Sequence, residues 1–400
     1  MPWMETHPVL QRHEFIASLL RGEESMAELC QRFGISRKTG YKWKERFEAL
    51  GPGGLDDLPR IAKTFPHRTT AQVERQLVAL KRKHPSWGPK KLVALLRGRF
   101  PDLVAPAAST AGDILKRHGL VEPRRRPARR PRLWKSPPLQ PVTAPNDTWS
   151  IDFKGHFRLS NRAYCYPLTV QDNFSRYLLR CVALPGIDSG PVEVVLDAAF
   201  REFGLPRAIR SDNGTPFAAN RGCLGLSALS LWWLKLGIRP ERIERGRPQQ
   251  NGRHERMHRT LKAETTRPPT RSFSAQQTAF DDFRREYNED RPHEALQQQR
   301  PADVYRRSPR AMPKKLPALE YPTTHEVRRV AWNGNFSYEG QRYYLTAVLA
   351  GENVGLTPLD DSNRQLWIGE LPVGYIDLRT RRFTPYAVKQ RELEAAVTAA

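Results

Sequence analysis

The stretch "TWSIDFKGHF", residues 148–157, alternates apolar and polar side chains. Successive side chains of a β-strand point to opposite faces, so Trp149, Ile151 and Phe153 share one face. Asp152 lies on the other face, between Ser150 and Lys154. A carboxylate on a core strand is costly unless a cation satisfies it. The stretch therefore predicts a core strand and marks Asp152 as a candidate functional residue.

The residues that follow predict an α/β fold. "AYCYPLTVQDNFSRYLLRCVAL" is typical of two strands, "GPVEVVLDAAFREFG" of a helix that Gly204 closes, and "RAIRSD" of a short strand. "LSALSLWWLKLGI", the run from about residue 251, and "SAQQTAFDDFRREYNEDR" are typical of helices. Three strands, a helix, a strand and further helices indicate a layered domain with mixed strand directions.

Two more carboxylates stand out by their context. Asp212 ends the short strand, directly before an Asn-Gly turn, and Glu255 is the single acid in "GRPQQNGRHERMHRTLK", residues 246–262. Two acids at strand ends and one on a following helix can converge on a divalent ion, and Mg²⁺ prefers carboxylate and water oxygens. Two such ions can assist phosphoryl transfer.

Four blocks together resemble a known family. "WSIDF", "RSDNGTPF" and "PQQNGRHERMHRTLK" resemble the three blocks of the DDE core shared by retroviral integrases and bacterial insertion-sequence transposases, and "YNEDRPHEAL" resembles the block that follows in those transposases. The resemblance implies an RNase H-like core that uses Mg²⁺ or Mn²⁺, with Asp152, Asp212 and Glu255 as catalytic metal ligands. The 42 residues between Asp212 and Glu255 exceed the spacing in the most familiar integrases, and "AANRGCLGLSALSLWW" holds the extra length.

The helix that carries Glu255 leaves an alternative open. Helical spacing places Asn251, Glu255, Arg259 and Lys262 on one face. We expect Arg259 and Lys262 to hold phosphates of a DNA end, whereas the alternative is a surface ion pair between Glu255 and Arg259. We expect Asn213 and Gly214 to shape the turn that orients Asp212. We expect Asp172 to cap the turn near Ser175, and the alternative is a supporting role near the metal. We expect His254 and His258 to face DNA or solvent.

The N-terminal 60 residues predict a helix-turn-helix domain. Ser25 and Glu28 form a capping-box pattern, Gly34 suits a left-handed turn, and Ser36 can cap the next helix. A basic second helix of this kind enters the major groove. The alternative is an ordinary three-helix bundle with a basic surface. The predicted DNA contacts of this helix are Arg37, Lys38, Thr39 and Lys42.

Four further regions complete the chain. Residues 61–122 predict a second helix-turn-helix domain, residues 123–145 a Pro- and Arg-rich linker, and residues 146–310 the RNase H-like core. Short strands with regular turns over residues 320–385 predict a small β-barrel. The linker is either a solvated tether or a further phosphate contact. Its predicted DNA contacts are Arg124, Arg125 and Arg126.

The overall charge favours a polyanionic partner. Lys and Arg number 66 against 42 Asp and Glu, a formal net charge of +24, which points first to nucleic acid. An anionic membrane surface is the other polyanion, but no apolar run approaches the roughly 20 residues that span a bilayer. The N-terminus lacks the apolar region of a signal peptide. Four scattered cysteines without a CxxC pair suit a reducing cytoplasm and argue against a zinc site or disulfides.

These features predict a cytoplasmic, nucleoid-associated DNA transposase. It would bind the terminal inverted repeats of its element, cleave each end to a 3′-OH and join that end to target DNA. Two ends must be joined together, so the prediction includes at least a dimer on double-stranded DNA. The alternatives are an RNase H-like nuclease without joining activity and a non-catalytic DNA-binding regulator.

Overall fold

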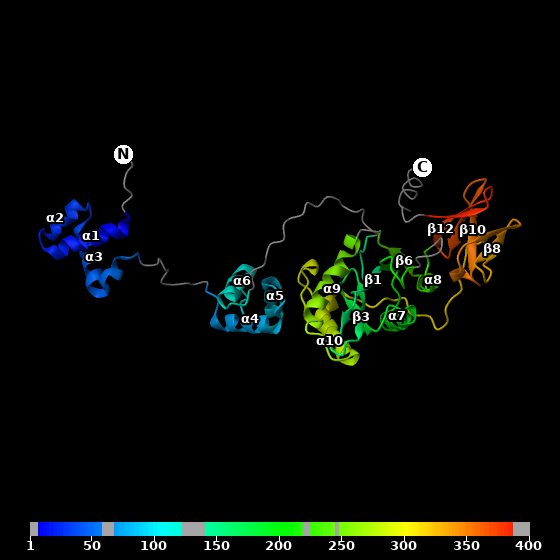
Figure 1. The fold of residues 1–400 in the computed structure, drawn as a ribbon, viewed down its shortest axis with the longest axis horizontal. Coiled ribbons are helices and arrows are strands. Elements are labelled where there is room, and N and C mark those ends of the chain that lie inside the picture. Colours follow the sequence, from blue (N-terminus) through cyan, green and yellow to red (C-terminus); the bar gives the residue numbers. More distant parts are fainter. Residues whose placement is uncertain (1–6, 58–67, 122–140, 219–224, 245–247, 387–400) are drawn as a thin grey trace. The chain divides into compact units, whose positions relative to one another are not determined.

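The structure, a computed structural model, describes residues 7–57, 68–121, 141–218, 225–244 and 248–386 (Figure 1). The chain divides into two compact units, Met1–Thr70 and Ala71–Ala400. Within the described ranges, no helix combines the length and apolar character needed to cross a bilayer.

The first unit contains the predicted helix-turn-helix pattern. Its helices are α1 (Pro8–Arg21), α2 (Met26–Arg32) and α3 (Arg37–Leu50), followed by a 3₁₀ turn, Gly51–Leu55. The Ser25 N–H donates to the Glu28 carboxylate at 2.8 Å, and the Glu28 N–H donates to Ser25 Oγ at 3.4 Å. Gly34 has φ of 64°, and Ser36 Oγ accepts from the Thr39 N–H at 3.2 Å. The predicted caps and turn are therefore present.

Gly40 lies inside α3, where glycine costs about 1 kcal/mol relative to alanine. A Cβ at this position would lie 2.5 Å from Cys30 Sγ and 3.0 Å from Met26 Sδ. Because α3 packs this closely against α2, a larger residue would force the two helices apart. The glycine therefore permits the helix pair rather than weakening it.

The second unit begins with three more helices around Trp87. They are α4 (Ala71–Lys83), α5 (Pro89–Arg99) and α6 (Ala108–Arg117), and Pro89 occupies the first turn of α5, where proline is favoured. Lys90 Nζ contacts the Glu294 carboxylate at 2.7 Å, and the Arg291 guanidinium lies 5.5 Å from the centre of the Trp87 ring. This ion pair and this cation–π contact therefore connect the helical group to residues 291–294, which follow α10 (Phe273–Arg285) in the chain.

The central domain contains a six-stranded mixed sheet. The order is β4-β3-β1-β5-β6, with the short β2 paired to β3. β1 is antiparallel to β3 and parallel to β5, and β5 is parallel to β6, so the predicted mixed directions are confirmed. The strands are β1 (Thr148–Phe153), β2 (Phe157–Arg158), β3 (Tyr164–Asp172), β4 (Leu178–Leu184), β5 (Ala208–Ser211) and β6 (Arg239–Arg242).

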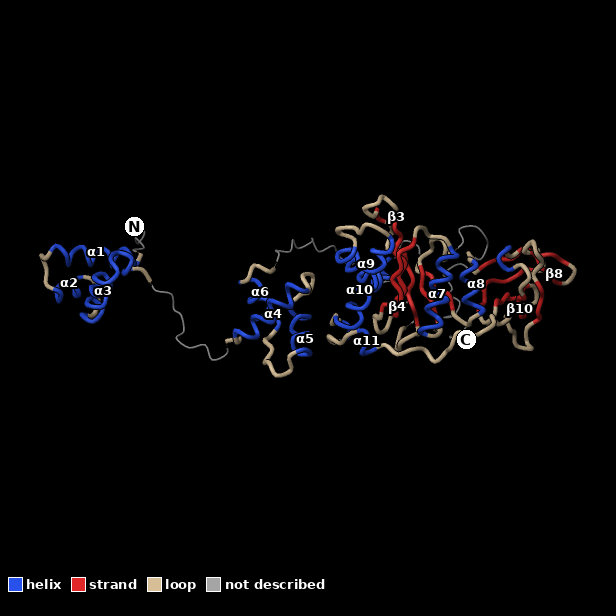
Figure 2. Tube along the Cα trace, turned by 90° about the horizontal axis from the view of Figure 1, so that it is seen from below, coloured by secondary structure: helices blue, strands red, loops and turns tan. Residues whose placement is uncertain are grey.

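Helices cover both faces of this sheet (Figure 2). On one face, α7 (Ser189–Phe203) and α8 (Ala228–Lys235) pack with Trp149 and Ile151 of β1. On the other, α9 (Gly252–Thr265) and α10 (Phe273–Arg285) pack against Cys165 and Cys181. β1 is therefore buried on both faces, and its polar face, which carries Asp152, lies under α9 rather than open to solvent.

α8 lies in the long spacing between Asp212 and Glu255, and it belongs to two cores. Leu229 and Trp233 pack into the core of the central sheet. Leu231 packs into the core of the C-terminal sheet, and Lys235 Nζ contacts the Glu352 carboxylate at 2.5 Å. A helix that is buried on two sides must be apolar nearly all round. This explains the unusually apolar stretch "ALSLWWLK".

The C-terminal region contains a five-stranded sheet and a two-stranded hairpin, and the predicted small β-barrel is not confirmed. The sheet order is β13-β12-β11-β10-β7, and β8 pairs with β9 alone. Among the described strands no pairing joins the hairpin to either edge, so no closed sheet forms, although both parts share one apolar core. The strands are β7 (Glu326–Arg329), β8 (Asn335–Tyr338), β9 (Gln341–Tyr344), β10 (Asn353–Pro358), β11 (Asn363–Ile368), β12 (Leu371–Asp377) and β13 (Arg382–Pro385).

Candidate active site

Asp152 and Asp212 lie at the same edge of the central sheet. β1 and β5 are parallel, with Ser150 opposite Arg210. Asp152 is two residues beyond Ser150, and Asp212 is two residues beyond Arg210. Because the carboxyl ends of parallel strands share an edge, this register brings the two predicted aspartates together.

The turn after β5 orients the Asp212 carboxylate. The Gly214 N–H donates to Asp212 Oδ1 at 3.1 Å, and Asn213 Nδ2 donates to the Ile243 carbonyl at 2.6 Å. A Cβ at position 214 would lie 3.0 Å from Asp212 Oδ2, so a side chain there would crowd the carboxylate. The structure therefore agrees with the expected role of Asn213 and Gly214 in shaping this turn.

Glu255 lies in the first turn of α9 and is exposed, as are Arg259 and Lys262 on the same face. Asn251, which was expected on this face, precedes the helix and is buried. No ion pair joins Glu255 to Arg259 in the described part of the chain. The exposed carboxylate is therefore available for another partner.

The three acids influence one another electrostatically. Burial, and next the charge of Asp212, raise the pKa of Asp152 to about 7, and Glu255 adds a smaller effect in the same direction. Among the described residues, no three His, Cys, Asp or Glu side chains are grouped closely enough to hold a metal ion. Asp152 and Asp212 thus converge, and Glu255 is within electrostatic reach of them without completing a tight cluster.

The expectation that His254 and His258 face DNA or solvent is wrong, because both side chains are buried beneath α9. His254 Nδ1 lies 2.6 Å from Ser150 Oγ, and its Nε2 lies 2.6 Å from Thr169 Oγ1. His258 Nε2 contacts the same Thr169 hydroxyl at 2.6 Å, and His258 Nδ1 lies 3.7 Å from Asp152 Oδ2. The two imidazoles therefore form a polar layer between α9 and the strands that carry Asp152.

This layer is uncharged. Burial lowers the pKa of His254 to about 3, and burial together with the neighbouring His254 lowers the pKa of His258. Thr169 Oγ1 can donate to the Asp152 carbonyl at 3.1 Å while it accepts from Nε2–H of both rings. His258 therefore packs a neutral ring beside the Asp152 carboxylate and helps to fix the strand that carries it.

The sequence contains a pattern that indicates the burial of these two histidines, and the prediction overlooked it. His254, Met257, His258 and Leu261 recur at helical spacing and are the buried positions of α9. The apolar pair Met257 and Leu261 marks the inward face, and both histidines fall on that face. Ser150 and Thr169 could be found only once the pairing of β1 with β3 was known.

Asp172 is structural, as predicted. It is fully buried, and its Oδ1 accepts from the Ser175 N–H at 2.7 Å and from Ser175 Oγ at 2.6 Å. Its Oδ2 accepts from the Asn146 N–H at 2.8 Å. Both carboxylate oxygens are therefore committed to the turn between β3 and β4 and to the start of the domain.

The predicted DNA contacts occupy different environments. Arg37, Lys38 and Lys42 are exposed at the start of α3, and Thr39 is partly exposed. The predicted linker contacts Arg124, Arg125 and Arg126 lie outside the described residues. Their role in binding DNA therefore remains a prediction for both groups.

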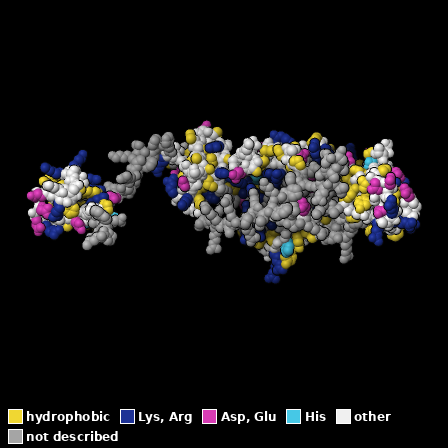
Figure 3. Space-filling model, turned by 90° about the horizontal axis from the view of Figure 1, so that it is seen from above, with side chains coloured by type: hydrophobic (Ala, Val, Ile, Leu, Met, Phe, Trp, Pro, Cys, Tyr) yellow, Lys and Arg dark blue, Asp and Glu magenta, His cyan; other side chains and the backbone are white. Residues whose placement is uncertain are grey.

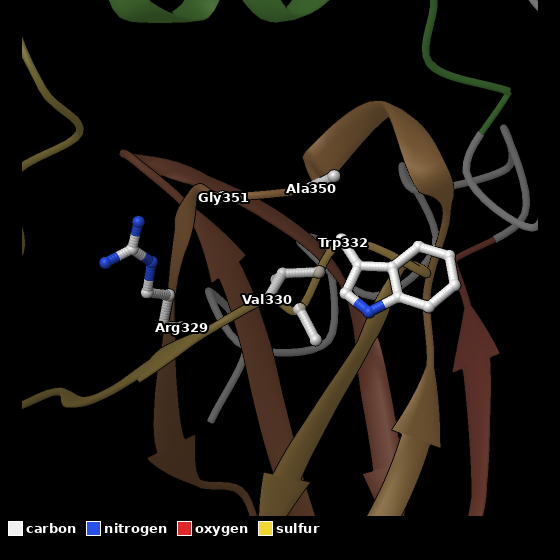
Figure 4. Close-up of a pocket in the computed structure, with 6 residues that line it drawn as sticks. Arg329, Val330, Trp332, Ala350 and Gly351 are labelled. Carbon is white, nitrogen blue, oxygen red and sulfur yellow. The ribbon is translucent and has the colours of Figure 1, made fainter.

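The C-terminal sheet carries a hollow of about 540 Å³ that none of the three acids lines. Its lining includes Arg329, Val330, Trp332 and Gly351 (Figure 4). The side chains of Arg329 and Trp332 point away from one another, and Trp332 is 85% exposed. These groups do not converge on a common ligand, so the carboxylate edge remains the candidate active site.

The central domain has a mixed sheet with two aspartates at one edge and a glutamate on the covering helix, and helix-turn-helix domains precede it. This combination defines the class of integrase-like core proteins. Family models agree with this class. Models of an integrase core domain match residues 142–248 and 236–301, a helix-turn-helix domain matches residues 11–63, and a homeodomain-like domain matches residues 39–115. The helix-turn-helix matches indicate DNA binding.

Relatives from insertion elements identify the family. An insertion element IS476 protein of 39.2 kDa from Xanthomonas euvesicatoria is 32% identical over 282 residues, which are 70% of this chain and 78% of the relative. An insertion element IS407 protein of 31.7 kDa from Burkholderia multivorans is 34% identical over 167 residues, 40% of this chain and 55% of that relative. The chain belongs to the insertion-element transposase family with an integrase-like core.

Similar solved structures include retroviral proteins at low identity. The HTLV-2 integrase catalytic core domain in complex with magnesium aligns at 15% identity and a TM-score of 0.33, over 41% of this chain and 98% of that chain. A simian T-cell lymphotropic virus intasome chain aligns at 18% identity and a TM-score of 0.36, over 78% of this chain and 99% of that chain.

Proposed function

We propose that this protein is a DNA transposase that cleaves the ends of its element to 3′-OH groups and joins them to target DNA. The observation that carries the proposal is the register of β1 with β5, which brings Asp152 and Asp212 to one sheet edge. Glu255 supplies the third carboxylate from α9. In this proposal the catalytic residues are Asp152, Asp212 and Glu255.

The donor set fits a hard divalent cation. Burial first, and next the charge of Asp212 with a smaller effect of Glu255, raise the pKa of Asp152, so a cation beside this carboxylate would relieve an unfavourable charge. Mg²⁺ or Mn²⁺ held by the three acids would supply the positive charge that phosphoryl transfer needs. The neutral His258 ring would pack beside Asp152 and hold its strand through Thr169. The exposed Arg259 and Lys262 would bind phosphates of the DNA end.

The remaining regions have proposed roles in recognition and assembly. Residues 1–60 and 61–122 would read the terminal inverted repeats, the linker 123–145 would contact phosphates, and residues 146–310 would form the catalytic domain. The β8–β9 hairpin would complete the C-terminal sheet as a small barrel. Pairing two ends requires at least a dimer, and the proposed location is the cytoplasm, at the nucleoid.

The test uses the DNA that flanks the coding region as the substrate. Purified protein with labelled end duplexes, supercoiled target plasmid and Mg²⁺ should release the 3′ end and join it to the plasmid. Asp152→Asn, Asp212→Asn and Glu255→Gln should each abolish both steps and leave end binding intact. Glu193→Gln, which neutralises an exposed acid on α7, is the matched control and should retain activity.

The products distinguish the alternatives. Cleavage without joined product would identify a nuclease. Binding without cleavage would identify a regulator. Strong joining by any of the three acid variants would remove that acid from the proposed metal site.

A further inference from the structure

The positive charge of this chain is unevenly distributed. Residues 320–386 contain eight Asp and Glu and seven Arg but no Lys, whereas the whole chain carries a formal charge of +24. Acidic and basic side chains are intermingled over this end of the molecule (Figure 3). Because attraction to a polyanion follows net positive charge, the C-terminal sheet is a weak candidate for binding one, and the excess of cations lies elsewhere.

The exposed side of α9 carries a row of cations. Arg253, Arg256, Arg259 and Lys262 follow one another at every third position, and all four are exposed. Side chains three positions apart are neighbours on a helix, so this row crosses the exposed side obliquely. At about 3.6 residues per turn, Lys262 lies on the side of Glu255, and Arg253 lies on the opposite side. Arg259 and Lys262 already have a proposed partner at the carboxylate edge, whereas Arg253 and Arg256 have none.

Arg253 shares a hydrogen-bond acceptor with a second arginine. Arg253 Nη1 donates to the Asn173 carbonyl at 2.9 Å, and Arg176 Nη1 donates to the same oxygen. A guanidinium has several N–H donors. Among the residues that the structure describes, neither side chain has another hydrogen bond or an ion pair. Two like charges are therefore held side by side with most of their donors unused.

The local backbone disfavours an arginine at both positions. Arg176 has φ of 66°, a left-handed conformation that glycine adopts far more readily. Arg253 lies in the first turn of α9, where the partial positive charge of the helix terminus favours acids over cations. Neither residue is the one that would best stabilise its own element, which points to a function for the two guanidiniums.

The electrostatics of these arginines are unfavourable without an anion. Burial, and next the charge of Arg253, lower the pKa of Arg176 to about 10, and Arg256 adds a smaller effect. Partial burial, and next the charge of Arg210, lower the pKa of Arg253. The nearby Asp172 offsets part of the repulsion, but both of its oxygens already accept hydrogen bonds within the turn and at the start of the domain. The guanidiniums stay charged at neutral pH, so a bound anion would relieve their repulsion.

The cations continue toward the second helix-turn-helix domain. Lys91 of α5 is half-buried. Burial, and next the charge of Arg291, lower the pKa of Lys91 to about 8, and Arg256 acts in the same direction. The two carboxylates that oppose this effect, Glu264 and Glu294, already form ion pairs with other side chains. The basic side of α9 therefore extends, through Arg256, to the domain that would read the terminal repeat.

We propose that Arg176, Arg253 and Arg256 bind backbone phosphates of the element's end DNA between the carboxylate edge and α4–α6. The proposal rests on the proposed transposase function and adds to it the path of the bound strand. A helix rises by about 1.5 Å per residue, so the row from Arg253 to Lys262 is about 14 Å long and can meet several successive phosphates. The end DNA fits better than target DNA, because the helices that would read the end contact the core on this side.

The test measures binding of the full-length protein to a fluorescein-labelled duplex of the element's end by anisotropy. Arg176→Gln combined with Arg253→Gln (the Gln pair) should weaken binding about tenfold or more at physiological salt. The Gln pair should also reduce the salt dependence of the affinity, because fewer phosphates are neutralised. Arg201→Gln combined with Arg307→Gln is the matched control. It removes two exposed guanidiniums beside α7, on the other face of the sheet, and should leave the affinity nearly unchanged.

Neutral methylphosphonates separate a direct contact from a change in fold. Single phosphates of the duplex are replaced one at a time. At a few positions the replacement should weaken binding of the wild type by about fivefold and have little effect on the Gln pair, because that variant no longer holds those phosphates. At phosphates that other parts of the chain hold, both proteins should lose affinity equally. Equal losses at every position would overturn the proposal.

Two further measurements address a structural role and a smaller ligand. Arg176→Lys combined with Arg253→Lys keeps both charges and should retain most of the affinity and the sensitivity to the same phosphates. A loss equal to that of the Gln pair would show that the arginines serve the fold. Inorganic phosphate at constant ionic strength should not displace the duplex. Displacement from the wild type but not from the Gln pair would identify a site for small phosphates and refute the assignment to DNA.

The joining assay separates failure of this inference from failure of the proposed function. A wild type that joins ends, beside a Gln pair that binds and joins equally well, would refute the phosphate contacts and leave the transposase standing. A wild type that shows the expected phosphate-specific losses but joins nothing would refute the transposase and leave the contacts standing.

Discussion

Asp152→Asn should stabilise the metal-free protein at pH 8 although it abolishes activity. Burial and the charge of Asp212 raise the pKa of Asp152 from 3.8 to about 7 in the folded state. A carboxyl group whose folded pKa is raised prefers to ionise in the unfolded chain. The resulting loss of stability is absent below the unfolded pKa, grows as pH rises from about 4 to about 7, and is constant above.

The size of the effect follows from the two pKa values. Each pKa unit corresponds to about 1.4 kcal/mol, so the shift from 3.8 to about 7 costs about 4 kcal/mol at pH 8. At pH 5 the same relation gives less than half of that cost. An asparagine amide has nearly the same shape and never ionises, so the variant should escape the penalty at both pH values.

The assay is thermal unfolding of the full-length wild type and variant in EDTA, followed by tryptophan fluorescence. The variant should melt several degrees higher at pH 8, with a smaller difference at pH 5. Mg²⁺ should raise the melting temperature of the wild type more than that of the variant. Melting temperatures that differ equally at both pH values, or a variant that is less stable at pH 8, would refute the reasoning.

Three further predictions address neighbouring groups. His258→Ala should reduce joining and the apparent affinity for Mg²⁺ by about 10- to 100-fold, as for other groups that position metal ligands. An unchanged dependence of joining on Mg²⁺ would show that the ring only fills space beside Asp152. Arg259→Glu combined with Lys262→Glu should abolish joining of precleaved ends while Mg²⁺ still raises the melting temperature, and near-normal joining would disprove the phosphate contact. Asp172→Ala should lower the free energy of unfolding in urea by about 3 kcal/mol or more, because it strands three buried donors, and a loss below about 1 kcal/mol would contradict this account.

The sequence predicted those parts of the fold that local patterns determine. Alternation over residues 148–153 predicted the strand that carries Asp152, and the Ser25–Glu28 capping box predicted where α2 begins. The roles of Asp172 and Gly214 were also predictable, because Asp and Gly act on neighbouring residues in a turn. In each of these cases the deciding contacts join residues close in sequence.

The features that depend on distant contacts could not be predicted in the same way. Met257 and Leu261 mark the inward face of α9 and with it the burial of His254 and His258, but the partners of these rings, Ser150 and Thr169, depend on how β1 pairs with β3. The predicted barrel required hydrogen bonds between the β8–β9 hairpin and an edge strand, and strand-forming residues do not specify such pairing. The polar layer beneath Asp152 therefore emerged only from tertiary structure.

The double burial of α8 limits how this protein can be divided. The helix lies between Asp212 and Glu255 in the sequence, and its Leu231 packs into the core of the C-terminal sheet. A fragment that stops at about residue 310 would leave this leucine face open to water, where it would favour aggregation. The segment between Asp212 and Glu255 that contains α8 depends on the C-terminal sheet, so the two would be gained or lost together during evolution. Recombination that exchanged one without the other would yield a chain that folds poorly.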